Sequence, residues 1–403
     1  MGKATKRPAI VWFRKELRLA DHEALATAAR SGAPVLPLYI HDCDTPGTVP
    51  AGGASRWWLH QSLKALDASL KELGGALILR EGPTRDVFER IIGETGATAV
   101  HATQSFEPFG TRSENDIAAQ CQEHGVAFHI HSGRLLYAPK DIVTKDGRPY
   151  RVFTPFWKAC LTRPAPRASL GIPKFSAFAD IDSDPLAALR LEPSQPDWAG
   201  GLRTTWTPGE RAAHDALAEF IDERMGAYGT LRNALAGKPT SLLSPYLHFG
   251  EISPTQVWHA VTHAIEASGG SIEKGASSFL REIGWREFSY HLLFSFPDLP
   301  NIPLRPEFAR FPWRDDPGAL AAWQRGQTGY PVVDAAMRQL WETGWMPNRA
   351  RMVVASFLVK HLVLPWQEGE EWFWDTLVDA DLANNSASWQ WVAGCGADAA
   401  PYF

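Results

Sequence analysis

Residues 379–403, DADLANNSASWQWVAGCGADAAPYF, combine side chains that neither a surface helix nor a core helix normally carries together. Two carboxylates, an Asn pair and two indoles crowd into thirteen residues that contain no Lys or Arg: Asp379, Asp381, Asn384, Asn385, Trp389 and Trp391. A surface helix mixes its charges, and a core helix excludes unpaired carboxylates. The two Asp therefore need cationic partners, and Arg349 and Arg351 in the upstream segment GWMPNRARM (residues 344–352) are candidates. A functional site and a buried salt-bridge network between two helices both fit this pattern.

Tryptophan is concentrated in the same half of the chain. Of the 17 Trp residues, eleven lie within residues 258–391, at positions 258, 285, 313, 323, 341, 345, 366, 372, 374, 389 and 391. Large flat rings bury much area and stack on other flat groups. The concentration therefore fits either a Trp-rich core or a site for an aromatic ligand.

The overall composition indicates a two-domain chain in a reducing compartment. A length of 403 residues favours two domains. The four Cys form no CxxC pair, which argues against a disulfide framework or a zinc site. No apolar run has the length of a membrane span. We therefore expect a cytoplasmic monomer without a metal and without membrane contact. The net charge of −5 argues weakly against a nucleic-acid partner, since a local basic groove is compatible with it.

The first third of the chain alternates between strand and helix patterns. Buried strands are predicted at residues 9–13, 35–40, 76–80, 99–102 and 127–131, and helices at residues 55–73, 84–95 and 114–124. A further helix follows the first strand, with Asp21 as its predicted N-cap. This alternation predicts a doubly wound parallel sheet. Neither G-x-G-x-x-G nor a P-loop is present, so the common nucleotide fingerprints give no support.

The remainder of the chain divides into a linker and a helical region. Residues 137–208 are rich in Pro and show one helix pattern, at residues 153–161. From residue 209 the strand signal disappears, and helices are predicted at residues 210–224, 255–267, 276–294, 318–324, 332–343, 350–362 and 370–377. The predicted fold class is therefore an α/β domain followed by an all-α domain. Residues 240–245, TSLLSP, place hydroxyls and backbone N–H groups where they can hold phosphate oxygens.

Several blocks closely resemble the DNA photolyase and cryptochrome family. They are TSLLSPYLHFGEISP (residues 240–254), FLREIGWREF (279–288), GYPVVDAAMRQLWETGWMPNRARMVVASFLVKHL (329–362) and the opening stretch. IVWFRKELRLADHEAL (residues 10–25) resembles the first strand and loop of that family. The resemblance is strongest to cyclobutane pyrimidine dimer photolyases. It implies a Rossmann-like antenna domain at residues 1–136, a linker, and a helical FAD-binding catalytic domain at residues 209–403.

The resemblance implies that the helical domain binds FAD in a folded, U-shaped form. The residues it assigns to the cofactor are Tyr228, Thr240, Ser241, Leu243, Ser244, Phe279, Glu282, Arg286, Asn348, Arg351, Asp379, Asp381 and Asn385. Among them, Tyr228 and the loop at residues 240–244 would hold the pyrophosphate. Asp379 would pair with Arg351, and Asn385 would face flavin N5 and stabilise the reduced flavin.

Two further sets of residues follow from the resemblance. Trp389, Trp366 and Trp313 would carry an electron from the surface to the photoexcited flavin. The residues that would contact DNA or its lesion are Arg232, Glu282, Trp285, Arg349, Met352 and Trp391. Glu282 would bond the dimer's base edge, and Trp285 and Trp391 would stack on the flipped dimer. For Arg232, a solvated helix charge is an equally simple interpretation.

Charge and departures from the family pattern refine these expectations. Residues 276–361 carry ten Lys or Arg and eight Asp or Glu, whereas residues 362–403 carry seven acidic residues and no basic one, so DNA contact is expected from the first segment.

Leu242, Pro347 and Glu16 stand where the family often has Arg, His and Asp. The residues that hold a folate antenna in some members find no match, so the antenna pocket is expected to hold a folate, a deazaflavin, another flavin or nothing. The family continues beyond the position where this sequence ends, so either a truncated chain or a shortened variant is expected.

The implied activity is light-driven, FAD-dependent DNA repair in which electron transfer from photoexcited reduced flavin splits cyclobutane pyrimidine dimers. The enzyme would be a deoxyribodipyrimidine photo-lyase, and its partner would be DNA that contains such dimers. One alternative is a cryptochrome-type blue-light receptor that signals through flavin redox changes. Another is a flavoprotein that binds nucleic acid without repair. The joint presence of Glu282, Trp285, Met352 and Trp391 favours repair.

Overall fold

The N-terminal part of the protein is a five-stranded parallel sheet. The computed structural model describes residues 7–399. Its strands are β1 (Ala9–Phe13), β2 (Val35–His41), β3 (Ile78–Glu81), β4 (Ala99–Thr103) and β5 (Ala127–His131), in the order β3-β2-β1-β4-β5. Each predicted strand is present, and the predicted boundaries differ by at most two residues.

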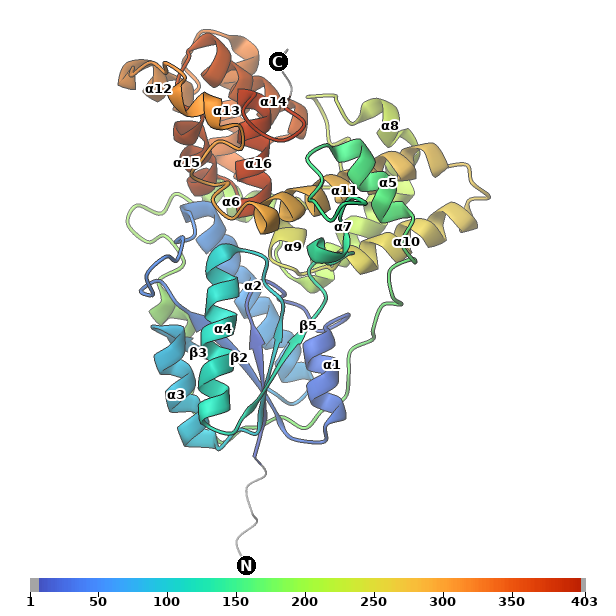
Figure 1. Ribbon diagram of the computed structural model, residues 1–403, viewed down its shortest axis with the longest axis vertical. Helices are drawn as coiled ribbons and strands as arrows, with labels where there is room; N and C mark the ends of the chain where they lie inside the picture. Colours follow the sequence, from blue (N-terminus) through green and yellow to red (C-terminus); the bar gives the residue numbers. More distant parts are fainter. Residues whose placement is uncertain (1–6, 400–403) are drawn as a thin grey trace, which may run out of the picture.

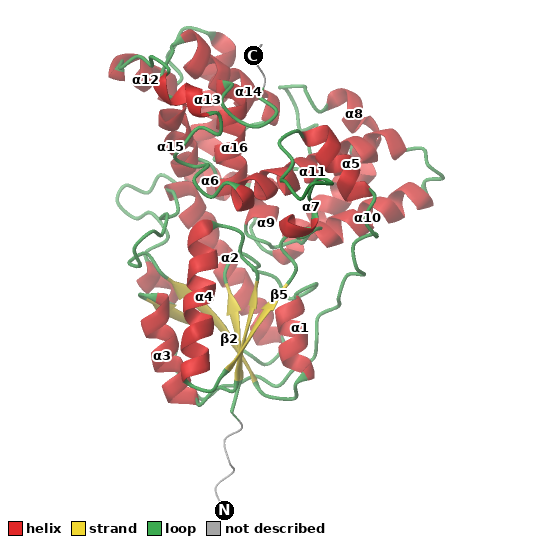
Figure 2. Cartoon of the chain, in the orientation of Figure 1, coloured by secondary structure: helices red, strands yellow, loops and turns green. Residues whose placement is uncertain are grey.

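Helices cover both faces of the sheet (Figures 1 and 2). The helices α1 (Glu23–Arg30) and α2 (Gly53–Glu72) pack on one face, and α3 (Thr84–Thr95) and α4 (Pro108–Glu123) pack on the other. Helix α4 begins six residues before the predicted start, because Pro108 occupies its first turn, where a missing N–H costs nothing. The sequence pattern predicted only its apolar part.

The predicted N-cap of α1 was wrong. His22 caps the helix, and its Nδ1 accepts a hydrogen bond from the Leu25 N–H at 3.1 Å. Asp21 is fully buried and has a left-handed backbone with φ of 51°. Its carboxylate accepts hydrogen bonds from Arg167 in the linker and from Ser253 in the helical part. The carboxylate therefore joins three regions of the chain and is not available to cap the helix.

The linker contains more regular structure than its Pro content indicated. It carries α5 (Phe153–Leu161), as predicted, as well as α6 (Gly200–Thr205) and the short 3-10 turns η1 (Pro139–Asp141) and η2 (Leu186–Leu189). It also runs beside the sheet, where Ala177 forms a parallel bridge with Val35. The linker is thus packed along the α/β part.

The remainder of the described chain is helical. Its elements are α7 (Glu210–Glu223), η3 (Met225–Ala227), α8 (Tyr228–Leu231), α9 (Ser244–His248), α10 (Pro254–Ala267), α11 (Glu273–Ser295), η4 (Pro306–Arg310), α12 (Pro317–Gln324), α13 (Pro331–Thr343), α14 (Asn348–Ser356), η5 (Phe357–His361), α15 (Trp366–Thr376) and α16 (Leu382–Ala393). The predicted helix at residues 350–362 is divided, since α14 passes into the π-helical turn η5. Figure 1 shows α11 crossing between the α12–α16 group and the group formed by α5, α7, α8 and α10.

The helical part docks on the end of the sheet where the strands terminate. Gly250, with φ of 64°, lies against the loop after β1, and a Cβ at this position would fall 2.3 Å from the Lys15 carbonyl oxygen. The next residue, Glu251, is fully buried and accepts hydrogen bonds from Trp58 and Ser62 of α2. The two parts therefore share a close interface that contains a buried carboxyl.

This buried carboxyl makes stability depend on pH. Burial raises the pKa of Glu251 to about 8. Because the folded chain then holds a proton that the unfolded chain has lost, stability falls as the pH rises from the unfolded pKa towards 8. Glu251→Gln removes the titrating group. Between pH 6 and 8, we therefore expect the free energy of unfolding of this variant to fall less steeply than that of the unmodified protein, by up to about 1.4 kcal/mol per pH unit. Urea unfolding at both pH values measures this slope, with the exposed Glu123→Gln as control. An unchanged slope in Glu251→Gln would contradict the assignment.

Candidate active site

The site is built around an ion pair between α14 and the segment before α16. Arg351 donates to both carboxylate oxygens of Asp379, at 3.0 and 2.8 Å. The Asp379 side chain is 3% exposed, and that of Arg351 is 24% exposed. This is the pair that the sequence predicted. Trp345 lies 5.9 Å from the Arg351 guanidinium, and its indole N–H donates to Ser244 at 3.2 Å. The pair is thereby linked to the loop at residues 240–244.

Asp381 joins the start of α16 to the domain interface. It is the N-cap of α16, since its Oδ1 accepts from the Asn384 backbone N–H at 2.9 Å and from the Asn384 side chain at 2.7 Å. Its other oxygen accepts from the Tyr290 hydroxyl and lies 3.9 Å from Arg134. Burial by itself raises the pKa of Asp381, but nearby His248 and the charges of Arg134 and Arg286 outweigh it and hold the pKa well below its usual value. Asp381 is therefore ionised and fixed in place.

Asn385 lies one turn into α16 and is held by α15. It is 8% exposed, and its Nδ2 donates to the Glu370 backbone oxygen at 3.0 Å. With its amide nitrogen bound in this way, the amide plane is oriented by α15. The Glu370 side chain accepts from Ser386 at 2.5 Å, and burial raises its pKa to about 8. Glu370 was not singled out from the sequence, because an acidic residue in an amphipathic helix is normally solvated.

The loop at residues 240–244 supplies hydroxyl groups in front of α9. Leu242 takes a left-handed conformation with φ of 58°, which turns the chain sharply. Ser241 Oγ accepts from the Leu243 N–H at 3.3 Å, and the Thr240 hydroxyl is buried without a partner among the described residues. An orphaned buried hydroxyl is costly unless a ligand satisfies it. The loop therefore fits a ligand that carries acceptor oxygens, as the FAD pyrophosphate does.

Helix α11 presents several predicted residues along one side. Phe279, Glu282 and Arg286 are spaced by three and four residues, which places them on neighbouring turns of one face. Phe279 meets the Tyr228 ring edge-on at 5.7 Å. Arg286 donates to the Arg134 backbone oxygen at 3.0 Å, so it also contributes to the domain interface. One helix face thus connects the residues assigned to the cofactor with those assigned to the lesion.

The residues assigned to the lesion gather only in part. Glu282 forms an ion pair with Arg232, and each side chain is about one third exposed. Arg349 donates to Asn233, next to Arg232, at 3.1 Å. On α14, Asn348 lies at the first turn, and its Nδ2 approaches the Met352 sulfur at 3.7 Å. These contacts draw α8, α11 and α14 together.

The two predicted wedge tryptophans lie in different hydrophobic clusters. Trp285 stacks face to face on Phe153 of α5, with ring centroids 3.8 Å apart. Trp391 packs against the cluster that is formed mainly by α13 to α16. Since Phe153 covers one face of Trp285, only the other face is left for stacking. Phe153 could not be anticipated, because it lies more than a hundred residues away, in the linker.

The three tryptophans of the predicted electron path belong to one aromatic cluster. Trp389 and Trp366 are each 2% exposed, and Trp313 packs on the same cluster and is partly exposed. The Trp389 ring lies directly over Gly369, where a Cβ would collide with it. Its nearest aromatic partners are Phe373 at 5.0 Å and Trp323 at 6.3 Å. The three tryptophans thus share one hydrophobic cluster that contains two buried indoles and a partly exposed one.

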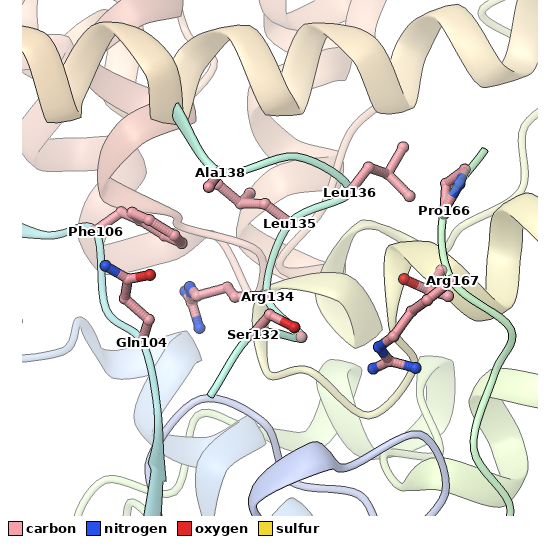
Figure 3. Close-up of a pocket in the computed structure, with 11 residues that line it drawn as sticks. Gln104, Phe106, Ser132, Arg134, Leu135, Leu136, Ala138, Pro166 and Arg167 are labelled. Atoms are coloured by element: carbon pink, nitrogen blue, oxygen red, sulfur yellow. The ribbon is translucent and has the colours of Figure 1, made fainter. Parts of the chain in front are cut away.

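A small cavity lies where the two parts of the protein meet (Figure 3). It has a volume of about 90 Å³, and the loops after β4 and β5, the linker and the start of α10 form its wall. Its polar lining residues include Gln104, Ser132, Arg134 and Arg167. Arg134 and Tyr290 were missed from the sequence. They are 156 residues apart in the sequence and meet only where the two domains dock. There, Arg134 Nη2 donates to the Tyr290 hydroxyl at 2.7 Å.

Comparison with known proteins agrees with this architecture. Residues 9–174 match the family model described as DNA photolyase, and residues 279–403 match the one described as the FAD binding domain of DNA photolyase. A deoxyribodipyrimidine photo-lyase of Agrobacterium fabrum is 47% identical over 398 residues, covering 98% of this chain and 82% of its own length. Cryptochrome-2 of Arabidopsis thaliana is 39% identical over 96% of this chain and 64% of its own length.

A solved structure gives the same result. The crystal structure of a bacterial class III photolyase from Agrobacterium tumefaciens superimposes with a TM-score of 0.95 at 46% identity, covering all of this chain and 82% of that one. Fold and site therefore define a flavoprotein with an α/β domain and a helical FAD-binding domain. The chain belongs to the DNA photolyase and cryptochrome family.

The described residues offer neither a metal centre nor a membrane-spanning helix. Within residues 7–399, no group of three or more His, Cys, Asp or Glu side chains is arranged to hold a metal ion. Over the same residues, none of the helices has both the length and the apolar character needed to cross a membrane.

Proposed function

We propose that this protein is a light-driven, FAD-dependent DNA lyase that splits cyclobutane pyrimidine dimers. The observation that carries the proposal is the single face of α11 that bears both Phe279, against Tyr228, and Glu282, paired with Arg232. A partly exposed carboxylate on the same helix face as a residue assigned to the cofactor supports this proposal. The photo-lyase of Agrobacterium fabrum, at 47% identity, is also more similar in sequence than the plant Cryptochrome-2, at 39%.

The residues present fit FAD, and each has a chemical role in the proposal. The loop at residues 240–244 binds phosphate oxygens, and the Arg351–Asp379 pair lines the flavin. Bound reduced FAD supplies an electron when it absorbs light. Asn385, held by the Glu370 carbonyl oxygen, presents its amide oxygen to the flavin and fixes the position of the N5 proton. Trp389, Trp366 and Trp313 would pass electrons from an external reductant to the bound flavin and so return it to its reduced form. The antenna group stays open among a folate, a deazaflavin and a flavin.

On the DNA side, different residues bind the phosphates and contact the damaged base. Arg232 and Arg349 bind phosphates that flank the lesion. Glu282 offers its carboxyl to the base edge of the flipped dimer, and Trp285, Trp391 and Met352 form the apolar walls that exclude water. Illumination of the reduced protein with a dimer-containing oligonucleotide tests the proposal: the dimers disappear in blue light and persist in the dark. Persistence under both conditions would contradict it.

The Glu282→Ala variant tests whether Glu282 acts in the repair chemistry or only in lesion binding. Loss of a hydrogen bond to a charged group, worth about 1.5–3 kcal/mol, lowers the repair yield per absorbed photon roughly tenfold or more. Affinity for the damaged oligonucleotide falls less, since the phosphate contacts are unchanged. Repair yield and affinity are measured on the same preparation, with Arg349→Met as the comparison variant that weakens affinity more than yield, because Arg232 is itself paired with Glu282. If both quantities fall equally in Glu282→Ala, Glu282 is only a binding residue.

A cryptochrome-type receptor is the second candidate. The 39% identity to a plant cryptochrome favours it, because the flavin-binding half is common to both groups. A receptor photoreduces its flavin without loss of dimers, so the same illumination experiment distinguishes the two functions.

A further inference from the structure

A buried arginine from the α/β part reaches the flavin site of the helical part. Arg134, in the loop after β5, is 7% exposed. Its Nη2 donates to the Tyr290 hydroxyl at 2.7 Å, and Tyr290 in turn donates to Asp381. Arg134 also lies 3.9 Å from Asp381 directly. Figure 3 shows Arg134 extending from its loop toward Gln104 on the opposite wall of the cavity.

The position of Arg134 is fixed from both sides. Its Nη1 donates to the Lys15 backbone oxygen at 3.0 Å, and Glu107, which is itself paired with Lys15, lies 3.5 Å away. From the helical part, Arg286 donates to the Arg134 carbonyl oxygen at 3.0 Å. These contacts hold the guanidinium in place independently of Asp381. The guanidinium therefore restrains the position of the Asp381 carboxylate.

Asp381 connects Tyr290 and Arg134 to the first turn of α16. One carboxylate oxygen faces Tyr290 and Arg134, and the other caps α16 through Asn384. A carboxylate held at both oxygens sets the position of the first turn of the helix. Asn385, the next residue, occupies that turn. Arg134 and Asn385 are thus connected by three contacts, although they lie in different domains.

We propose that Arg134 is a positioning residue of the flavin site: through Tyr290 it fixes Asp381 and the start of α16, so that docking of the α/β part sets the placement of Asn385. The inference rests on the proposed function for its flavin readout. It gives the α/β part a role in the flavin site in addition to any antenna role.

The test compares three variants with a matched control. Arg134→Met keeps an unbranched apolar stem and removes the charge, Tyr290→Phe removes only the hydroxyl, and Arg134→Lys restores a charge. Glu210→Gln is the control, because Glu210 joins the two parts by accepting from the Leu19 and Ala20 N–H groups and does not touch Asp381. The readouts are the dissociation constant for FAD and the reduction potential of bound flavin.

We expect Arg134→Met and Tyr290→Phe to weaken FAD binding at least tenfold and to shift the potential. Arg134→Lys recovers part of both, and Glu210→Gln lowers stability with neither change. Equal values for Tyr290→Phe and the unmodified protein, or an equal shift in Glu210→Gln, would overturn the proposal. If Arg134→Met does not fold, Tyr290→Phe and Arg134→Lys decide.

A second readout does not require flavin. In a double-mutant cycle on the flavin-free protein, Arg134→Met and Asp381→Asn together destabilise less than the sum of the two single changes, because each removes the same interaction. Additive effects would contradict the connection. A protein that passes this cycle and repairs no dimers refutes only the proposed function.

Discussion

Trp389→Phe abolishes photoreduction of the flavin and leaves repair by chemically reduced protein intact. Phenylalanine is far harder to oxidise than an indole, so the first step of electron transfer to the photoexcited flavin is lost. Repair starting from flavin reduced with dithionite does not use this step. The measurement is the change in flavin absorption during anaerobic illumination with an external reductant, followed by a repair assay on the dithionite-reduced sample.

The cluster provides its own control for this prediction. Trp323 is fully buried and lies 6.3 Å from Trp389, but it is outside the proposed path. Trp323→Phe opens a similar cavity and also removes the indole hydrogen bond to the Val354 carbonyl oxygen, so it costs at least as much stability. We expect it to photoreduce normally. Normal photoreduction in Trp389→Phe, or equal loss in both variants, would show that the path has been assigned to the wrong residues.

Asp379→Ala destabilises the protein and empties the flavin site. Asp379 is almost fully buried, and its removal leaves the Arg351 guanidinium unpaired beside Trp345. Breaking a buried pair from one side costs about 3–5 kcal/mol, and we expect about 2–3 kcal/mol here because Arg351 is a quarter exposed. Urea unfolding of the flavin-free protein measures the cost, and absorbance measures the flavin content after purification.

An exposed Arg–Asp pair, in which the single nitrogen Arg203 Nη1 contacts both oxygens of Asp197, serves as the comparison. Arg203 donates to both oxygens of Asp197 at 3.0 and 2.8 Å, but both side chains are exposed. Exposed pairs contribute little, so Asp197→Ala leaves stability and flavin content nearly unchanged. If Asp379→Ala costs no more than Asp197→Ala and retains its flavin, Asp379 is not part of the cofactor site.

The sequence predicted most of the fold because its periodic signals are local. Residues 9–13, 84–95, 127–131 and 153–161 have the predicted boundaries. Errors arose where a non-local contact determined the outcome. Asp21 has the side chain of a good N-cap, but buried partners from the linker and the helical part hold it elsewhere, and His22 caps the helix instead.

The residues of the candidate site also differ in whether the sequence alone could predict them. The pairing of Asp379 with Arg351 was accessible from the sequence, since two uncompensated carboxylates required a cation and the family resemblance indicated which one. Arg134, Tyr290 and Glu370 carried no local signal. Their positions are determined by domain docking and by contacts of α15 with α16, where they hold the predicted residues Asp381 and Asn385 in place.

The wavelength dependence of dimer loss tests the central claim most directly. The dithionite-reduced protein is illuminated with a dimer-containing oligonucleotide at a series of wavelengths, and the dimers lost per incident photon are counted. If light absorbed by reduced flavin drives repair, the yield follows the absorption spectrum of the reduced flavin, together with that of any bound antenna, and is zero in the dark. A protein that contains flavin and binds the oligonucleotide, but loses no dimers at any wavelength, would contradict the account.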